Sequence, residues 1–509
     1  MLARVNSVAH IGLMSVAIEV EVDVASTGFP GFNIVGLPSK AVEEAKERVK
    51  TAIVNTGCSF PQKKIIVNLA PADINKDGSC YDLPIALGIL LAAGEIGANQ
   101  DISKSIFYGE LSLDGHIRHT KGVLLVGIFA LEQGIKKVFV PKDSSREAAV
   151  VDKIQVFPVV NLKELIDHLT QNSQIKPLRK IVVDKLMRGS ESEFDFSEVL
   201  GAEQAKRALT IAAAGGHNIL MAGPPGSGKT MLARALPSIL PPLTPTEALE
   251  VTRIYSASGL LNPGEAIVTN RPFRFPHHST SLVGLIGGGS RPMPGEISLS
   301  HLGVMFLDEM AEFPRSVMES MRQPMEDGKI VVSRAAGRIE FPAKFMLVAA
   351  VNPCPCGFLN HPKKQCICTL RQIERYKRRI SGPILDRIDI HINVPFVEAE
   401  KLSSEVSSES SDSIRKKVTS ARQIQTERFK SFKNIYTNSQ MNNKQVKLFC
   451  ALTDEEKKLM RTAVEKHSLS TRSYFRILKV ARTIADLTKE KNIKIEHLAE
   501  ALQYRMRVF

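Results

Sequence analysis

The sequence contains no tryptophan, and aromatic residues make up only 6% of its 509 residues. No apolar run reaches the roughly 20 residues that a helix needs to cross a bilayer, so we expect neither a membrane span nor a membrane partner. Residues 18–24 alternate apolar with acidic side chains, which predicts a half-buried strand and not a signal peptide. We therefore expect a soluble protein of the cytoplasm.

Cysteine is also scarce, with seven residues in the whole chain. Cytoplasmic thiols stay reduced, which argues against disulfides. Four of the cysteines form two Cys-x-Cys pairs inside the segment 352–368, namely Cys354, Cys356, Cys366 and Cys368. Four thiolates suit tetrahedral Zn²⁺, and the intervening loop is long enough to bring the pairs together. The pattern predicts a zinc site, with reduced thiols that bind nothing and a redox switch as the alternatives.

Acidic residues are outnumbered, 53 against 67 lysines and arginines, which gives a net charge of +14. Such an excess indicates a polyanionic partner, nucleic acid before membrane. It is concentrated in residues 361–379, where Glu374 is the single acid beside Lys363, Lys364, Arg371, Arg375, Lys377, Arg378 and Arg379. This stretch predicts contacts to a DNA backbone, or else a solvated helix face with ion pairs between subunits. Because aromatic residues are few, we expect basic side chains to bind the phosphate backbone of DNA, with little stacking of aromatic side chains on bases.

One motif in this sequence is highly specific for phosphate binding. An apolar run at 219–222 leads into a glycine-rich loop, and a helical pattern follows. Backbone N–H groups of such a loop close around phosphates at the start of a helix. Lys229 would reach the β- and γ-phosphates, and Thr230 would ligate Mg²⁺. The predicted nucleotide-binding residues are Gly223, Pro224, Pro225, Gly226, Ser227, Gly228, Lys229 and Thr230.

Two further apolar runs end in polar residues that would complete an ATPase site. The run 303–307 leads into Asp308, which would hold Mg²⁺, and Glu309, which would polarise the attacking water. The run 344–351 ends at Asn352, which would orient that water or contact the γ-phosphate. An ordinary asparagine at the end of a strand is the alternative. The three motifs together predict an ATPase that uses ATP and Mg²⁺.

These motifs, in this order, resemble the AAA+ ATPases. The segments "PFRFPHHSTSLVGLIGGGSRPMPGEISLSHLGVMFLDEM", "SGPILDRIDIHINVP" and "STRSYFRILKVARTIADL" are more specific, and they resemble the magnesium-chelatase-like ComM/YifB competence family. The resemblance extends over essentially the whole chain. It implies a hexameric ring that acts as a DNA helicase and branch-migration factor in natural transformation. Single-stranded and branched or double-stranded DNA would be its partners, with recombination proteins as further candidates. A chelatase-like motor that remodels a protein is the alternative.

The resemblance also assigns roles to individual residues. Asn352 corresponds to sensor 1 of these ATPases, and Arg387 to the arginine finger that reaches a neighbouring subunit's γ-phosphate. Pairing of Arg387 with a flanking aspartate is the alternative. Arg472 corresponds to sensor 2 of the lid, with Arg476 as the second candidate. The predicted catalytic set is therefore Glu309, Asn352, Arg387 and Arg472.

The expected fold class is α/β with a helical C-terminal lid. Residues 1–170 resemble the proteolytic domain of Lon proteases, but Cys80 stands at the serine position and Leu124 at the lysine position. A thiol without its activating base is not a working nucleophile, so we expect a non-proteolytic domain. A linker is expected at 171–195, the AAA+ core at 196–396 with the zinc loop 352–368, and the lid at 397–509.

About 60 residues separate the phosphate-loop helix from the Asp308 strand, which is long for such a connection. The resemblance places an insertion in helix 2 here and a hairpin, "EDGKIVVSRAAGRIEF", before sensor 1. In related proteins such insertions line the pore of the ring. The implied DNA contacts are Arg271, Arg274, His277, His278 and glycines 287–289, with a purely structural insertion as the alternative.

Overall fold

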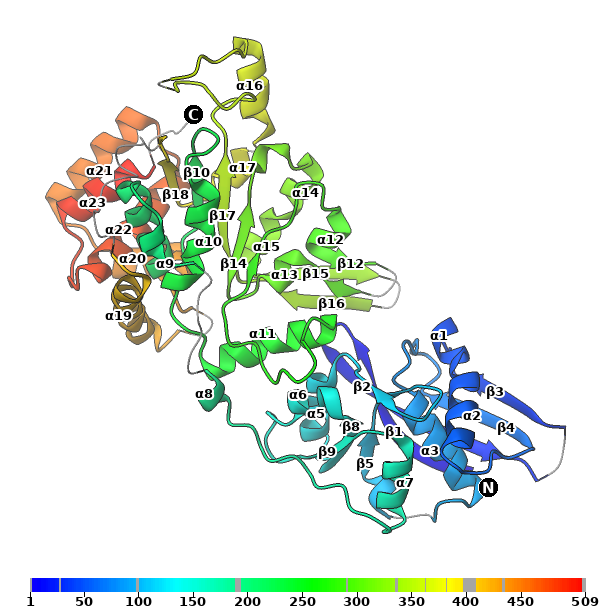
Figure 1. The fold of residues 1–509 in the computed structure, drawn as a ribbon. Coiled ribbons are helices and arrows are strands. Elements are labelled where there is room, and N and C mark those ends of the chain that lie inside the picture. Colours follow the sequence, from blue (N-terminus) through cyan, green and yellow to red (C-terminus); the bar gives the residue numbers. More distant parts are fainter. Residues whose placement is uncertain are drawn as a thin grey trace. The chain divides into compact units, whose positions relative to one another are not determined.

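The computed structural model of the chain describes residues 2–26, 29–97, 100–187, 194–289, 292–334, 337–361, 363–380, 382–396, 409–432 and 435–505. Its internal packing separates two compact units (Figure 1). The first, unit 1, comprises Met1–Gly189 and Thr244–Thr269. The second, unit 2, comprises Ser190–Leu243 and Asn270–Phe509. Parts of the predicted linker and lid, residues 188–193 and 397–408, lie outside the described residues.

Unit 1 is built on a seven-stranded mixed sheet with strand order β3-β4-β2-β1-β5-β8-β9. Alternating side chains set its faces: Ile18, Val20 and Val22 of β2 are buried, as the sequence pattern predicted. The strands, with the separate pair β6 and β7, are β1 (Leu2–Ile11), β2 (Met14–Val24), β3 (Gly31–Val35), β4 (Lys64–Ala70), β5 (Ser105–Phe107), β6 (Glu110–Leu111), β7 (Ile117–Arg118), β8 (Lys137–Pro141) and β9 (Gln155–Val159).

The helices of unit 1 cover this sheet. Helix α3 packs on β1 and β2, and because it is apolar on all sides, nearly every one of its side chains is buried. The helical segments are α1 (Lys40–Glu43), α2 (Ala45–Asn55), α3 (Asp82–Ala93), α4 (Gln100–Ser103), α5 (Val123–Glu132), η1 (Lys142–Ser144), α6 (Ser145–Ala148), α7 (Leu162–Leu169), α8 (Val183–Leu186) and α11 (Pro245–Ser258).

Helix α11 belongs to unit 1 although the chain has already entered unit 2 before it. A capping box at Thr244 starts the helix, and Gly259 in the left-handed conformation ends it. Helix α11 packs against α5, and Ala266 beyond it joins a small apolar cluster with Leu124. The sequence assigned these residues to the ATPase core, and the packing places them in unit 1.

Unit 2 contains a five-stranded, fully parallel sheet with strand order β11-β14-β17-β10-β18. A parallel sheet flanked by helices is the α/β architecture that the motifs predicted, so the predicted fold class is confirmed. In a parallel sheet the carboxyl ends of neighbouring strands meet at one edge, where ligands bind. The strands are β10 (Ile219–Ala222), β11 (Phe273–Arg274), β14 (Val304–Leu307), β17 (Met346–Val351) and β18 (Ile390–Asn393).

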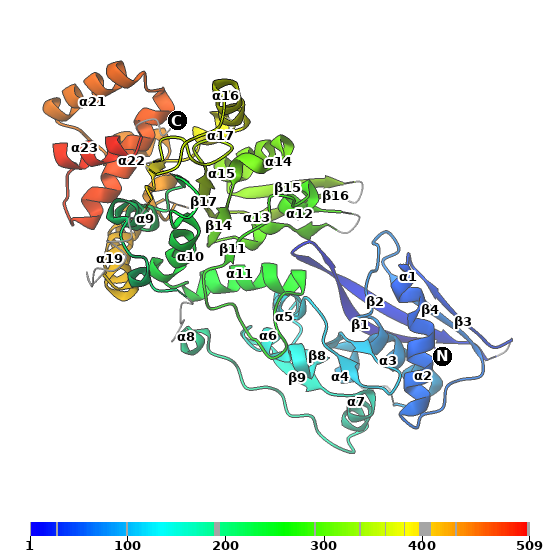
Figure 2. The same ribbon diagram turned by 45° about the horizontal axis from the view of Figure 1, so that its top comes forward.

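Both predicted insertions are present in unit 2. A short hairpin of β12 (Gly287–Gly288) and β13 (Met293–Pro294) lies between α12 (Leu282–Ile286) and α13 (Glu296–Leu299). A longer hairpin of β15 (Lys329–Arg334) and β16 (Gly337–Pro342) precedes β17. Figures 1 and 2 show this second hairpin beside α12.

The remaining helices of unit 2 include the C-terminal helical region. It shares one apolar core with the sheet, because α19 and α22 pack on α9. These helical segments are η2 (Phe196–Glu198), α9 (Glu203–Gly215), α10 (Lys229–Ile239), η3 (Met310–Glu312), α14 (Arg315–Ser320), α15 (Arg322–Asp327), α16 (Leu370–Arg379), α17 (Gly382–Leu385), α19 (Ser411–Phe429), η4 (Asn438–Gln440), α20 (Asn443–Phe449), α21 (Asp454–His467), α22 (Thr471–Leu487) and α23 (Ile495–Gln503). Among the described residues, no helix combines the length and the apolar character needed to cross a membrane.

Candidate functional site

The glycine-rich loop joins the end of β10 to the start of α10. Gly223 has no room for a side chain, because a Cβ atom there would collide with the carbonyl oxygen of Val394. Gly226 and Gly228 have φ angles of +77° and +85°, which side-chain-bearing residues rarely adopt. The N–H of Gly223 donates to the carbonyl of Val351 at 3.1 Å, which ties the loop to β17. The loop therefore leads directly into the N-terminal turn of α10, a geometry in which backbone N–H groups can contact a phosphate.

Lys229 is the first residue of α10, and its side chain lies inside the loop. Its Nζ donates to the carbonyl oxygens of Gly223 at 2.7 Å and Pro224 at 2.8 Å. Burial lowers the pKa of Lys229, and the nearby carboxylates of Asp308 and Glu309 oppose that shift. A buried ammonium group held at the centre of a phosphate-binding loop fits the predicted contact with the β- and γ-phosphates.

The predicted magnesium ligands lie side by side. Asp308 follows β14 directly, and its Oδ2 accepts a hydrogen bond of 2.8 Å from the hydroxyl of Thr230. Its Oδ1 accepts from the backbone N–H of Glu309 at 2.9 Å. A hydroxyl and a carboxylate are ligands that Mg²⁺ takes together with phosphate oxygens, so these residues fit the ion. Glu309 has a φ of +49° and an exposed side chain, as a residue acting on water requires.

Asn352 completes this arrangement from the neighbouring strand. Strand β17 lies between β14 and β10 in the sheet, and Asn352 follows its last residue. The Oδ1 of Asn352 lies 3.4 Å from Nζ of Lys229. The structure thus brings together residues that follow three different strands, and two of them, Lys229 and Asn352, are 123 positions apart in the sequence. Lys229, Thr230, Asp308 and Asn352 form one polar cluster, with Glu309 beside it.

The two predicted arginines converge on a carboxylate that sequence reasoning missed. Nη2 of Arg387 lies 2.6 Å from Oε1 of Glu326 in α15, and Nη2 of Arg472 lies 3.6 Å from the same oxygen. The Arg387 side chain is only 6% exposed, and its Nη1 also donates to the carbonyl of Pro383 at 2.7 Å. Arg472 is 59% exposed. Glu326 begins the "EDGK" turn before a hairpin, and no motif in the sequence distinguishes it.

Arg476, the second candidate for sensor 2, is held in a buried ion-pair network. Its guanidinium pairs with Asp389, which is buried and also accepts from Nδ1 of His217 at 3.1 Å. Burial alone would raise the pKa of Asp389, but Arg476 and His217 hold it well below its usual range. The buried Asp389 carboxylate thus links the start of β18 to Arg476 of α22. Asp389 is therefore engaged by Arg476 and His217, while its neighbour Arg387 pairs with Glu326.

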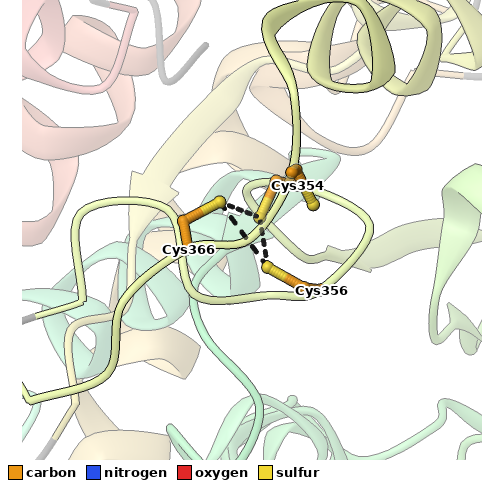
Figure 3. Close-up of side chains that lie close together, drawn as sticks. Cys354, Cys356 and Cys366 are labelled. Carbon is orange, nitrogen blue, oxygen red and sulfur yellow. Dashed lines mark hydrogen bonds between the residues drawn. The ribbon is translucent and has the colours of Figure 1, made fainter.

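The four cysteines of the segment 352–368 come together, and Figure 3 shows three of them, Cys354, Cys356 and Cys366. Their sulfur atoms all lie within 4.8 Å of one another. The Sγ atoms of Cys354, Cys356 and Cys366 are separated by 3.4, 3.7 and 3.6 Å. Four Zn–S bonds of about 2.3 Å in a tetrahedron separate the sulfurs by about 3.8 Å, so Cys354, Cys356, Cys366 and Cys368 fit a zinc ion.

Of the residues expected to line a pore, the two arginines are engaged in contacts within unit 2, whereas His277 is exposed. Arg271 donates to the carbonyl oxygens of Pro241 at 2.6 Å and Leu302 at 2.7 Å, and Arg274 forms a bidentate pair with Glu296. These two arginines hold the insertion to the core. The imidazole rings of the neighbours His277 and His278 lie tilted against each other with centroids 4.1 Å apart, and His277 is exposed. Glycines 287 and 288 form β12.

Unit 1 has no protease-like arrangement at the two positions that the Lon resemblance indicates. Cys80 is buried, and desolvation raises the pKa of its thiol to about 12, so a thiolate is disfavoured. Leu124 is fully buried in the apolar cluster that includes Ala266. The N–H of Leu124 donates to Glu147, which also accepts from Ser256 of α11. Residues 244–269 therefore pack over position 124, where the Lon resemblance would place a catalytic lysine.

Comparison with known proteins covers nearly the entire chain. Three family models match in succession: "Subunit ChlI of Mg-chelatase" at residues 20–144, "Magnesium chelatase, subunit ChlI" at 195–402, and "Magnesium chelatase, subunit ChlI C-terminal" at 408–505. Competence protein ComM of Haemophilus influenzae is 42% identical, over 100% of this chain and 98% of that protein.

Two other relatives extend the comparison. YifB of Salmonella typhimurium is 40% identical, over 99% of this chain and 97% of that protein. A Lon protease of Mycoplasmopsis agalactiae is 22% identical over 33% of this chain and 18% of its own length. The partial match to a Lon protease supports the predicted origin of one α/β domain, and the full-length matches define the family.

Proposed function

Because the chain belongs to the ComM/YifB family of magnesium-chelatase-like AAA+ proteins, we propose that it is an ATP-dependent DNA motor. The observation that carries the ATPase part is the convergence of Lys229, Thr230, Asp308 and Asn352 at one edge of a parallel sheet. Phosphoryl transfer needs positioning and charge stabilisation more than covalent chemistry, and this cluster supplies the groups for both.

Each residue of the cluster has a defined task in this proposal. Lys229 contacts the β- and γ-phosphates, and Thr230 with Asp308 holds Mg²⁺, which would neutralise phosphate charge. Glu309 accepts the proton of the attacking water, and Asn352 orients that water. Arg387 stabilises charge on the nucleotide of a neighbouring subunit, and Arg472 contacts nucleotide from the lid. Such trans action requires a ring, for which the family resemblance suggests a hexamer.

The DNA-directed part of the proposal rests on family and charge. The relative from Haemophilus influenzae carries the name competence protein, and the chain has a net charge of +14. We infer a helicase and branch-migration factor that acts on recombination intermediates of natural transformation in the cytoplasm. Its substrates would be single-stranded and branched or double-stranded DNA, and recombination proteins would be its partners.

Strand displacement on a three-stranded DNA substrate tests this function directly. The purified protein should release the third strand with ATP and Mg²⁺ but not without ATP, because translocation requires hydrolysis. Lys229→Ala should abolish release by removing the ammonium group that binds the phosphates. A protein that hydrolyses ATP at the same rate with and without DNA, and displaces no strand, would contradict the proposal.

A second function is favoured by the three matches to magnesium chelatase subunits. In this alternative, the same ATPase ring remodels a protein partner. It predicts ATP hydrolysis that does not respond to DNA, so the DNA-stimulation arm of the experiment above separates the two functions. Proteolysis is not proposed, because Leu124 offers no base and Cys80 is a buried, protonated thiol.

We also propose that Cys354, Cys356, Cys366 and Cys368 bind one structural zinc ion. The sulfur separations match a tetrahedral site. Four protein ligands fill the coordination sphere of zinc, as in structural zinc sites. Bound zinc would fix the loop that follows Asn352 and precedes α16.

Metal analysis of the purified protein provides the test of this site. We expect about one zinc per chain in the wild type and almost none in Cys366→Ser, because three thiolates bind zinc far more weakly than four. Cys58→Ser is the matched control, since Cys58 is a half-buried cysteine of unit 1 outside the cluster, and should keep its zinc. A metal-free wild type with four thiols that react freely would contradict zinc binding.

A further inference from the structure

Helix α16 is the most basic helix of unit 2, and it contacts the polar cluster formed by Lys229, Thr230, Asp308 and Asn352. Helix α16 follows the cysteine loop and buries only Ile373 and Tyr376. Arg371, Arg375 and Arg378 recur at intervals of four and three residues, so they form one stripe on the exposed side. They line a hollow on the surface of the helix.

The charges of this stripe are largely uncompensated. Within the described part of the chain, no carboxylate pairs with Arg371 or Arg375. Arg378 lies 3.9 Å from Glu374, which is a weak exposed contact. A row of arginines without partners is electrostatically complementary to a row of phosphates, whose counterions it would release.

The opposite side of α16 contacts Asn352 of the polar cluster and the turn beside Glu309. The phenol oxygen of Tyr376 faces the backbone N–H of Asn352, and burial raises the pKa of Tyr376 to about 12, so the hydroxyl stays protonated. Nη1 of Arg379 lies 2.8 Å from Oε2 of Glu312. Glu312 ends η3, the turn that starts directly after Glu309.

The cysteine loop makes a third contact with the nucleotide cluster. Gly357, between the two cysteine pairs, has a φ of +81° and packs so closely on Pro225 that a side chain would collide with the proline ring. Pro225 is part of the glycine-rich loop. The segment 352–379 therefore touches sensor 1, the turn after Glu309 and the phosphate loop, and it carries the arginine stripe on its outer surface.

We propose that the Arg371, Arg375 and Arg378 stripe binds the phosphodiester backbone of DNA, and that the Arg379–Glu312 ion pair transmits this binding to the ATP site. The proposal rests on the DNA-motor function above and names a surface for it outside the two insertion hairpins. DNA held by α16 would fix the helix and with it the turn that carries Glu309. Hydrolysis would then respond to DNA through one helix, the contact of its buried Tyr376 with Asn352 and one partly exposed ion pair.

The binding surface is tested with Arg371→Ala/Arg375→Ala in the full chain, using a labelled forked DNA at several salt concentrations. Each lost phosphate contact should lower the slope of log affinity against log salt by about 0.9 for duplex DNA. The matched control is Lys458→Ala/Arg461→Ala, which removes two exposed charges from α21 and should keep the wild-type slope. An unchanged slope in the α16 variant would overturn the DNA surface. A lost oligomer with intact DNA affinity would overturn it too, and would assign the stripe to a subunit interface.

The coupling is tested separately with Glu312→Gln. This variant should bind the forked DNA with wild-type affinity and slope, but DNA should stimulate its ATP hydrolysis several-fold less. Arg379→Ala should show the same loss, and the double variant should lose no more, because both single changes break one ion pair. Full stimulation in Glu312→Gln would overturn the coupling. A wild-type protein that binds no DNA would instead refute the proposed function itself.

Discussion

Glu309→Gln should bind ATP as the wild type does and yet hydrolyse it roughly 10²–10⁴-fold more slowly, the usual contribution of a general base. The substitution keeps the size of the side chain and removes only its ability to accept a proton. Glu309 is exposed, and its backbone N–H donates to Asp308, so the exchange should leave the Thr230–Asp308 contact intact. Nucleotide binding by fluorescence and single-turnover hydrolysis measure the two properties separately.

Glu312→Gln is the natural comparison for this variant, because Glu312 belongs to the same turn but pairs with Arg379. It should retain hydrolysis in the absence of DNA at a rate far above that of Glu309→Gln. Normal DNA-stimulated turnover in Glu309→Gln would remove Glu309 from the role of base. Loss of ATP binding in that variant would point to a structural role for the carboxylate instead.

Arg387→Ala should lower kcat by about 10³–10⁵-fold if it acts as an arginine finger, since this is the effect of such a group on phosphoryl transfer. The structure makes this a demanding test, because Arg387 pairs with Glu326 of its own chain and is almost fully buried. Acting on a neighbouring subunit requires this pair to open. Glu326→Gln should therefore weaken the hold on Arg387 without removing the finger.

Mixing experiments distinguish trans action from a structural role. Arg387→Ala retains its phosphate loop, and Lys229→Ala retains its arginine, so a ring that contains both should regain part of the activity that each lacks alone. Arg322→Ala is the control, because Arg322 of α15 forms a partly exposed pair with Glu319 of α14, and its loss should cost less than about 1 kcal/mol. Co-assembled variants that stay inactive, together with a lowered melting temperature of Arg387→Ala, would assign Arg387 a structural role.

The sequence alone predicted the nucleotide site in considerable detail. A glycine-rich loop between a strand and a helix has few other uses, so Gly223 to Thr230 could be assigned from their order. Asp308 and Asn352 could be assigned because each ends a strongly apolar run. Their proximity followed from one rule, that carboxyl ends of parallel strands share an edge.

The partners of the two arginines and the unit to which residues 244–269 belong could not be predicted from local sequence patterns. Glu326 carries no motif, and its meeting with Arg387 and Arg472 depends on how α15, α17 and α22 pack. The alternative of an aspartate partner for Arg387 failed because Asp389 is engaged by His217 and Arg476. Similarly, residues 244–269 lie between two segments of the ATPase core in sequence and pack in unit 1.

The sequence by itself determined the fold class, the family and the residues of the proposed nucleotide and zinc sites, because each depends on residue types in a fixed order and spacing. Tertiary structure decided which side chains these residues face. It placed Tyr376 against Asn352, Arg379 against Glu312 and Gly357 against Pro225. Contacts of this kind join residues far apart in the chain through the packing of a whole unit, and no local pattern of hydrophobicity or charge specifies them.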